Sequence, residues 1–308
     1  MRFGFHLFMI DPREYIDIAR ACDESGWDHL ACGDSPYHPE VITAPYPYTP
    51  DGKRFWPLED PILDPWVAIT QMAMVTTRLR FVTSVLRMPV RKPLLEAKAA
   101  CSVAVVSNNR LGVGIGLGWM PEEFRFLHEN MKTRGARADE AIQILRLCMG
   151  GGMVEFHGKH YDFDRLIMEP HPSERVPIYV GGLSDAARRR AARHGDGWLG
   201  ALHTMEELKQ LVPDMMKIRR EYGREKEPFH IFLQSPDVKS LDDYKRLEEL
   251  GVTHYWIVPW VYYGVQPEKE RLTDDKVATL FNVQPGVRAK VDSIKRFGDE
   301  VIAKLNQG

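Results

Sequence analysis

A single unit recurs along the chain, in which a stretch with the helical period of apolar residues ends at a glycine and a short β-rich stretch follows at once. Apolar residues at helical spacing fill 15–25, Gly26 follows, and residues 27–32 have strand composition. The same order returns around Gly195 and Gly251. Glycine just past a helix supplies the left-handed cap, and an immediate strand is typical of the helix-to-strand joints of a parallel sheet.

The pattern predicts eight strands that alternate with helices. They are residues 2–8, 27–33, 80–85, 111–116, 177–181, 197–201, 229–233 and 253–258. This number and alternation predict an α/β protein of the (β/α)8 TIM barrel type, although the period alone also allows an open doubly wound sheet. We expect one domain over residues 1–308.

Two insertions interrupt the alternation. Residues 36–63, rich in proline and aromatic residues, follow the second strand, and residues 150–175 precede the fifth. The run MVEFHGKHYDFD in the second insertion resembles a small β-hairpin. A last helix is predicted over 287–305.

Composition narrows the class of protein. The chain has 308 residues, 44% of them hydrophobic and 27% charged, with a net charge of -2, so nothing favours nucleic acid or an anionic membrane as a partner. Its apolar runs are too short to span a bilayer, and its first residues lack a cleavage pattern. Four scattered cysteines without a C-x-x-C pair fit free thiols in a reducing cytoplasm.

In a barrel of this kind, chemistry is expected where strands end and the following loops begin. Asp34 follows an apolar strand, so its carboxylate is either a base or ring hydrogen-bond acceptor, or a cap of its own loop. Nearby His38 is either a substrate or proton-relay residue, or a solvated loop histidine. Candidates for substrate contact are the aromatic residues Phe8, Tyr37, Trp119 and Trp260.

The turn after the fifth strand is the clearest local signal. Gly181 and Gly182 end the strand IYVGG, and Ser184 opens a helix. Glycines allow close approach of backbone N–H groups, and a helix N-terminus favours an anion. The alternative is an ordinary turn with Ser184 as N-cap, and the local sequence weighs the two equally.

A glycine-rich run, GVGIGLG at 112–118, does not match G-x-G-x-x-G in register. Its glycines indicate either close approach of a flat ring or crowding inside the barrel. His157 and His160 in the predicted hairpin lack metal-ligand spacing, so we predict no metal site. The absence of G-x-S-x-G disfavours an α/β-hydrolase.

Taken in order, these turns resemble the luciferase-like monooxygenase superfamily, in particular its oxidoreductases that depend on the deazaflavin coenzyme F420. The resemblance rests on FGFHLF, ESGWDHLACGD, RLRFVTSVLRMPVRKPLLEAKAACSVAVVSNNRLGVGIGLGWMPEEF, RGARADEAIQILRLCMGGGMVEFHGKHYDF and PIYVGGLSDAARRRAARHGDGW. It covers nearly the whole chain and implies a barrel, often dimeric, with the cofactor at the C-terminal ends of its strands.

The resemblance also implies roles for particular residues. The bond Ser84–Val85 matches a non-prolyl cis peptide that lies against the deazaflavin ring, and Asp34 matches a position near the ring. The matching cofactor contacts are Arg87, Ile115 and Gly116, and, at the phosphate, Gly181, Gly182, Ser184 and Asp185. Leu117 and Leu183, which lie beside them in the same turns, are further candidates for cofactor contact.

Two departures from the family bear on the reaction. Glucose-6-phosphate dehydrogenases of this type carry His after the Asp and Glu after the glycine of the fourth strand, where this chain has Ser35 and Leu117. Sugar-phosphate oxidation is therefore disfavoured. A G-R-N-A-G-W-N run, typical of FMN-dependent alkane and alkanesulfonate monooxygenases, is absent, which favours F420.

Three hypotheses remain. The first is hydride transfer between F420 and a small apolar or aromatic substrate, with Asp34 or His38 relaying a proton. The second is an FMN-dependent monooxygenase that receives FMNH2 from a reductase and reacts with O2. The third is a flavin-binding protein without catalysis. We also expect a homodimer and a flavin or F420 reductase as partner.

Overall fold

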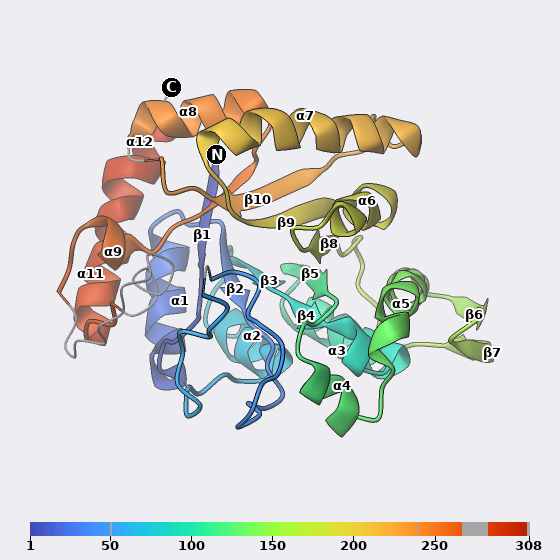
Figure 1. Cartoon of the computed structure of the whole chain (residues 1–308). Coiled ribbons are helices and arrows are strands. Elements are labelled where there is room, and N and C mark those ends of the chain that lie inside the picture. Colours follow the sequence, from blue (N-terminus) through green and yellow to red (C-terminus); the bar gives the residue numbers. More distant parts are fainter. Residues whose placement is uncertain (50, 239, 267–282, 307–308) are drawn as a thin grey trace.

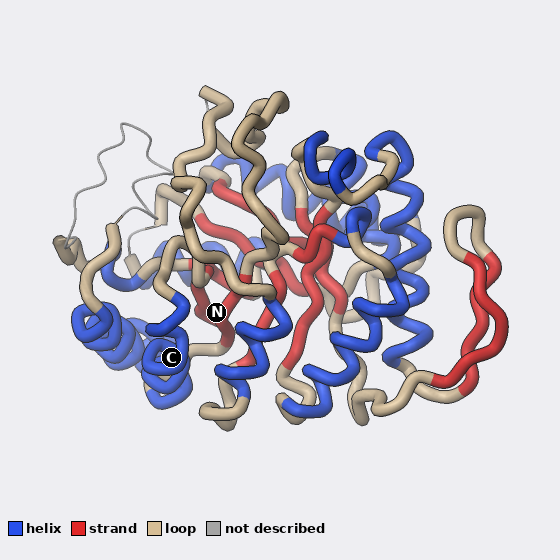
Figure 2. Tube along the Cα trace, turned by 90° about the horizontal axis from the view of Figure 1, so that it is seen from below, coloured by secondary structure: helices blue, strands red, loops and turns tan. Residues whose placement is uncertain are grey.

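The computed structural model describes residues 1–49, 51–238, 240–266 and 283–306. Its main sheet is a closed ring of eight parallel strands (Figures 1 and 2). They are β1 (Arg2–His6), β2 (His29–Cys32), β3 (Arg80–Thr83), β5 (Leu111–Gly116), β8 (Ile178–Gly181), β9 (Gly197–Leu202), β10 (His230–Gln234) and β11 (His254–Trp256). Pairing of β3 with β5 closes the ring, which confirms the TIM barrel and excludes the open sheet.

Helices surround this barrel. They are α1 (Tyr15–Glu24), α2 (Pro65–Ala73), α3 (Pro93–Val106), α4 (Pro121–Phe126), α5 (Arg134–Met149), α6 (Asp185–His194), α7 (Met205–Glu221), α8 (Leu241–Leu250), α9 (Pro259–Tyr262), α11 (Val287–Phe297) and α12 (Ala303–Leu305). A π-helical turn, Gly298–Ile302, joins α11 to α12, so the predicted last helix is present with one widened turn. Among the described helices, none is long and apolar enough to cross a membrane.

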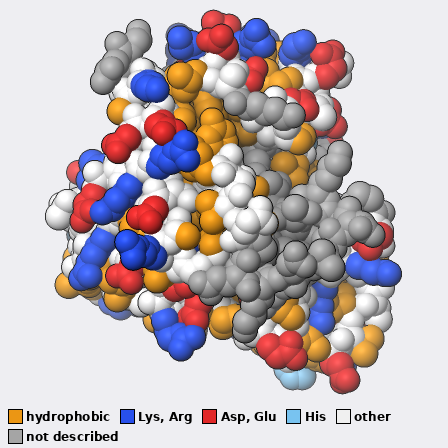
Figure 3. All heavy atoms as spheres, turned by 90° about the vertical axis from the view of Figure 1, so that its left-hand side faces the viewer, with side chains coloured by type: hydrophobic (Ala, Val, Ile, Leu, Met, Phe, Trp, Pro, Cys, Tyr) orange, Lys and Arg blue, Asp and Glu red, His pale blue; other side chains and the backbone are white. Residues whose placement is uncertain are grey.

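Both insertions lie where they were predicted. Residues 36–63 form an irregular excursion without helix or strand among their described positions. The second insertion contains the antiparallel hairpin of β6 (Met153–His157) and β7 (Asp162–Ile167), which projects beside α5 (Figure 1). On the face drawn in Figure 3, basic and acidic side chains are interspersed over the described part, as the near-neutral net charge predicts.

The core has two parts because inward and outward residues alternate along each strand. Most buried side chains lie between the strands and the helices. A smaller cluster fills the barrel itself and consists of Ala31, Val82, Tyr179, Leu199, Phe232 and Trp256, with Val85 packed on it. The barrel is therefore a packed core and not a pore.

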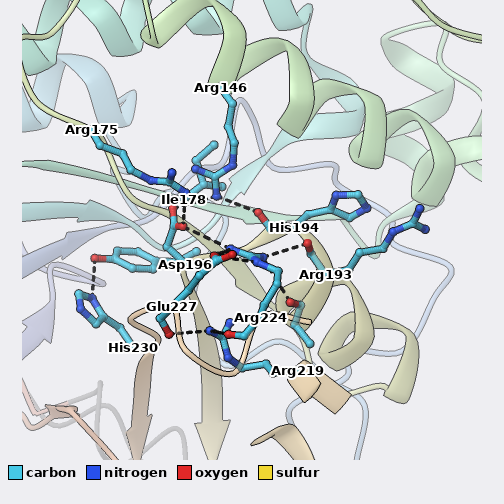
Figure 4. A network of polar contacts seen from close by, with 12 residues as sticks. Arg146, Arg175, Ile178, Arg193, His194, Asp196, Arg219, Arg224, Glu227 and His230 are labelled. Atoms are coloured by element: carbon cyan, nitrogen blue, oxygen red, sulfur yellow. Dashed lines mark hydrogen bonds and ion pairs between the residues drawn. The ribbon is translucent and has the colours of Figure 1, made fainter. Parts of the chain in front are cut away.

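Asp196, directly before β9, organises the N-terminal end of the barrel (Figure 4). Its Oδ2 accepts hydrogen bonds from Arg146 Nη2 and the Ile178 N–H, both at 2.8 Å, and its Oδ1 accepts one from Arg175 Nη2 at 2.7 Å. Burial alone would raise the pKa of Asp196, but the charge of Arg146 and the Ile178 N–H outweigh it, and the pKa lies below its ordinary value of 3.8. The carboxylate ties α5, β8 and β9 together.

We predict that Asp196→Asn lowers the free energy of unfolding at pH 7 by about 1–3 kcal/mol, because the partly buried Arg146 loses its counter-charge and the Ile178 N–H loses a charged acceptor. Since the folded pKa is depressed, the stabilisation is complete above the ordinary value and is lost as pH falls through the folded value. The difference from the parent should therefore shrink below about pH 4 in urea titrations.

The matched control for this prediction is Asp162→Asn. Asp162 also carries a paired carboxylate, bonded to His157 at 2.7 Å, but its side chain is 72% exposed. We expect a change within about 0.5 kcal/mol, as for other exposed pairs. Equal losses in the two variants would contradict the role assigned to Asp196.

Candidate cofactor site at the C-terminal end of the barrel

The third strand is interrupted at a special peptide bond. After β3, the Ser84–Val85 bond is cis, as the resemblance implied, and Ser84 N–H donates to Cys32 O at 2.7 Å. The chain then resumes as β4 (Leu86–Arg87) beside β5. This bulge turns Val85 over the end of the barrel.

Val85 explains two of the glycines that follow neighbouring strands. A Cβ added to Gly116 would lie 2.4 Å from Val85 Cγ2, and one added to Gly181 would lie 2.7 Å from Val85 Cγ1. Valine is stiff about χ1, so it cannot move aside cheaply. Four predicted cofactor positions, Ser84, Val85, Gly116 and Gly181, are thus brought together.

Asp34 is buried beside this bulge and holds three hydrogen bonds. Arg91 donates from Nη2 to Oδ1 at 2.7 Å and from Nε to Oδ2 at 3.0 Å, and the Arg87 N–H donates to Oδ2 at 2.9 Å. Arg91 also pairs with Glu96 on α3 at 3.0 Å. Burial alone would lower the pKa of Arg91, but Asp34 and Glu96 raise it. Asp34 Oδ2 therefore holds the backbone that follows the cis bond, while both oxygens are held by Arg91.

A second buried ion pair lies beside the first and joins Arg87 to Glu123. Arg87 Nη1 contacts Glu123 Oε1 on α4, and the Glu123 side chain is fully buried. Within the described structure, Glu123 Oε2 has no hydrogen-bond partner. Sequence reasoning missed Arg91 and Glu123, whose pairings span 57 and 36 residues.

Hydrogen bonds join the first insertion, residues 36–63, to α4 beside these two ion pairs. Thr43 donates to Glu122 Oε1 from its hydroxyl at 2.6 Å and its N–H at 3.1 Å. Tyr37 OH donates to Glu123 O at 3.2 Å. His38 Nδ1 lies 3.5 Å from the Ser35 hydroxyl, and burial lowers the pKa of His38.

The insertion also carries an aromatic cluster. The Tyr46 ring lies 5.2 Å from that of Trp119 and 4.9 Å from that of Trp56, and Trp56 lies 5.4 Å from Phe8. Phe8 and Trp119, from different strand ends, therefore join one surface. By contrast, Trp260 is 1% exposed and donates its indole N–H to Val283 O at 2.8 Å in the outer core. The structure does not place this predicted substrate residue at the strand ends.

The turn after β8 has the features of an anion site. Gly182 has φ +131°, where an added Cβ would lie 2.8 Å from Ala187 Cβ, and Trp198 Nε1 donates to its carbonyl at 2.9 Å. Ser184 is the N-cap of α6, with Oγ accepting from the Ala187 N–H at 3.2 Å. Leu183 and Asp185 are exposed beside it.

Two buried nitrogens near this turn lack partners among the described residues. Arg188 Nε, on the first turn of α6, and His203 Nε2, just beyond β9, make no hydrogen bond. Buried polar atoms are rarely left so, and positive charge at a helix N-terminus suits a phosphate. The residues present therefore fit the phosphate end of a flavin-type cofactor.

The remaining predicted positions contribute differently. Ile115 pairs with Leu86 and its side chain is fully buried in the outer core, so only its backbone is available to a ligand. Leu117 is half-buried directly after β5. These placements leave the roles of both residues as predictions.

Comparison with known families identifies the family of this chain. Residues 4–278 match the family described as luciferase-like monooxygenase. The chain therefore belongs to the luciferase-like monooxygenase family.

Individual relatives show which kinds of enzyme the chain resembles. An uncharacterized protein of Mycobacterium tuberculosis is 37% identical over 305 residues, 99% of this chain and 100% of that protein. An F420-dependent glucose-6-phosphate dehydrogenase of Gordonia bronchialis is 27% identical, covering 94% of this chain and 85% of its own. An FMNH2-dependent dimethylsulfone monooxygenase of Pseudomonas fluorescens is 32% identical over 46% of this chain and 39% of its own. The protein is thus related to F420- and FMNH2-dependent oxidoreductases.

Among solved structures, the coenzyme F420 dependent tetrahydromethanopterin reductase of Methanopyrus kandleri superposes with a TM-score of 0.71 at 15% identity, over 99% of both chains. At this identity, the likeness shows the barrel fold.

We predict that Gly116→Ala lowers the free energy of unfolding by about 1–3 kcal/mol, because its methyl group overlaps Val85. Combined with Val85→Ala, the same change should cost less than in the parent, giving a favourable coupling in a double-mutant cycle measured by urea unfolding. Gly33→Ala is the control, since an added Cβ there meets nothing within 4 Å. Strictly additive effects of the Gly116 and Val85 changes would refute this packing.

Proposed function

We propose that the protein is an F420-dependent oxidoreductase that acts on a small apolar or aromatic substrate at the C-terminal end of the barrel. The observation that carries the proposal is the pair of unpartnered nitrogens, Arg188 Nε and His203 Nε2, beside the N-terminus of α6. Arg188 offers positive charge where the phosphate of a cofactor is expected, with Asp185 3.6 Å away. Burial lowers the pKa of His203, so its Nε2 offers a hydrogen-bonding position and not a charge. Relatives aligned over nearly the whole chain support F420, whereas the FMNH2-dependent relative aligns over less than half of it.

When bound, the deazaflavin would supply hydride chemistry, while the protein supplies position and electrostatics. We assign Ser84 and Val85 to backing the ring. Asp34 is a positioning residue, because both of its oxygens hold Arg91 and the Arg87 N–H. This role replaces the proton relay that sequence reasoning offered for Asp34.

We assign proton exchange with the substrate to His38. Burial lowers the pKa of His38 against a hydrogen bond with the Asp60 backbone that raises it, and the charges of Arg54 and Arg87 lower it further, so its environment favours the neutral imidazole. A neutral imidazole can accept a proton, which an imidazolium cannot. His38 lies in the insertion that also carries the aromatic cluster.

The aromatic cluster of Phe8, Tyr46, Trp56 and Trp119 supports an apolar or aromatic substrate. Rings arranged edge to face bind flat apolar molecules through dispersion and quadrupole contacts. Homodimer formation and a separate reductase remain predictions of this proposal.

The first experiment identifies the cofactor. Untagged protein is titrated with F420 and, separately, with FMN, and binding is followed by fluorescence and calorimetry. We expect saturable F420 binding and much weaker FMN binding. Tight FMN binding without F420 binding, together with O2 consumption in the presence of FMNH2, would replace the proposal with the monooxygenase.

The second experiment tests the phosphate end. We predict that Arg188→Gln weakens F420 binding by about 10- to 100-fold, because a charge-assisted hydrogen bond is worth about 1.5–3 kcal/mol. Arg189→Gln is the matched control on the same helix, since Arg189 is hydrogen-bonded to Asp185 at 2.9 Å and Glu221 at 3.1 Å, whereas Arg188 lies 3.6 Å from Asp185 and its Nε has no hydrogen bond among the described residues. Equal loss in both variants would indicate a diffuse charge effect and contradict a site at Arg188.

A further inference from the structure

The opposite, N-terminal end of the barrel holds a second polar site that the cofactor does not use. A cavity of about 220 Å³ lies there between the first residues of several strands. Its polar lining consists of Arg2, Asp28, His29, Arg80, Tyr179, His230 and His254. Three histidines and a carboxylate at one end of a barrel are more than its packing requires.

Asp28, His29 and His254 bring three ligand-type atoms together. Asp28 Oδ2 lies 3.1 Å from His29 Nδ1 and 3.8 Å from His254 Nε2, and all three atoms lie within 4.8 Å of one another. Two ligands bound tetrahedrally to one zinc ion at about 2.0–2.1 Å stand about 3.3 Å apart. The observed separations bracket that value.

The hydrogen bonds of Thr253 indicate how His254 is oriented. The Thr253 hydroxyl accepts the Ile231 N–H at 2.8 Å and donates to Ile231 O at 3.2 Å. The same hydroxyl lies 2.7 Å from His254 Nδ1. In the tautomer in which Nδ1 carries the proton and donates to this hydroxyl, the lone pair of His254 Nε2 faces the Asp28 carboxylate. A cation between the two would then satisfy both.

The other ring of the group is also buried and faces Asp28. His29 is 1% exposed, its Nδ1 faces Asp28, and its Nε2 has no hydrogen-bond partner in the described structure. Metal-binding histidines commonly have their second nitrogen held by a neighbouring group, as Thr253 holds His254. His230 next to them is held in turn by Tyr179, with 3.1 Å between Nδ1 and the phenol oxygen.

We propose that Asp28, His29 and His254 bind a divalent transition-metal ion, Zn²⁺ in the first place, at the N-terminal end of the barrel. Two imidazole nitrogens and one carboxylate oxygen suit zinc, and the fourth position opens to the cavity. The ion links the starts of β2 and β11 across β1, which lies between them and pairs with both. The site is independent of the cofactor and of the proposed reaction.

Two arginines near the site set its selectivity. Arg2 Nε lies 3.8 Å from Asp28 Oδ1, which leaves Oδ2 for the ion, and Arg80 lines the same cavity. Their positive charge disfavours cations that bind through charge alone. Mg²⁺ and Ca²⁺, which prefer several oxygen ligands, should therefore not bind.

The test uses untagged protein freed of metal by a chelator. Zn²⁺ titration by calorimetry should give one site per chain, and Zn²⁺ should raise the melting temperature while Mg²⁺ does not. Co²⁺ should give the intense visible absorption of a four-coordinate site. Absence of Zn²⁺ binding by the parent protein, or stabilisation by inorganic phosphate in place of Zn²⁺, would overturn the proposal.

Variants locate the ion. His254→Gln and Asp28→Asn should each weaken Zn²⁺ binding by at least about 10-fold. His157→Asn is the matched control, because His157 also pairs with an aspartate, Asp162, at 2.7 Å but lies on the exposed hairpin. It should leave Zn²⁺ binding unchanged. Loss of binding in His157→Asn with retention in the other two variants would place the ion elsewhere and refute the assignment.

Discussion

The close approach of β3 to β5 is the constraint on which the rest of the structure depends. This approach closes the sheet, and it requires that β5 carry no side chains on its inward face. A Cβ at Gly114 would lie 2.0 Å from Thr83 O, and Thr83 Oγ1 bonds the Gly114 N–H and carbonyl at 2.8 Å each. On the same inward face, a Cβ at Gly112 would lie 2.7 Å from the Tyr179 ring. The glycines of this strand let side chains from its neighbours fill the barrel.

The same constraint shapes the cofactor end. Because Gly116 also lacks a side chain, the cis bond can turn Val85 across the end of β5. The chain then continues as β4 beside β5. The Arg87 N–H then meets Asp34, which Arg91 holds in place from the start of α3. A packing requirement inside the barrel thus fixes a rigid surface at its rim, which is what a preorganised binding site needs.

How far the sequence could predict this structure depended on the range of each interaction. Helix-to-strand joints are local, so the barrel, both insertions and the last helix were predictable from period and glycine placement. The glycine run 112–118 had two interpretations, and at Gly112 and Gly114 crowding inside the barrel accounts for it. Trp260 was misplaced because an aromatic residue after a strand has the same local pattern whether it faces the rim or the outer core. Arg91 and Glu123 carried no local signal, since their partners are distant in sequence.

The buried polar groups at the ends of the barrel differ in how they are satisfied, and His29 Nε2 at the N-terminal end also has no hydrogen bond within the described structure. Asp196 is saturated by arginines and a backbone N–H, as expected of a group that serves stability. Arg219 has side-chain nitrogens without hydrogen bonds, but its guanidinium lies 4.1 Å from the centre of the Phe229 ring, which accounts for them. Arg188 lies 3.6 Å from Asp185 and His203 lies 3.6 Å from Glu207, but Arg188 Nε and His203 Nε2 themselves have no hydrogen bond within the described residues. Buried nitrogens without hydrogen bonds do not stabilise the fold. A bound ligand that supplies the missing hydrogen bonds explains their presence at this turn.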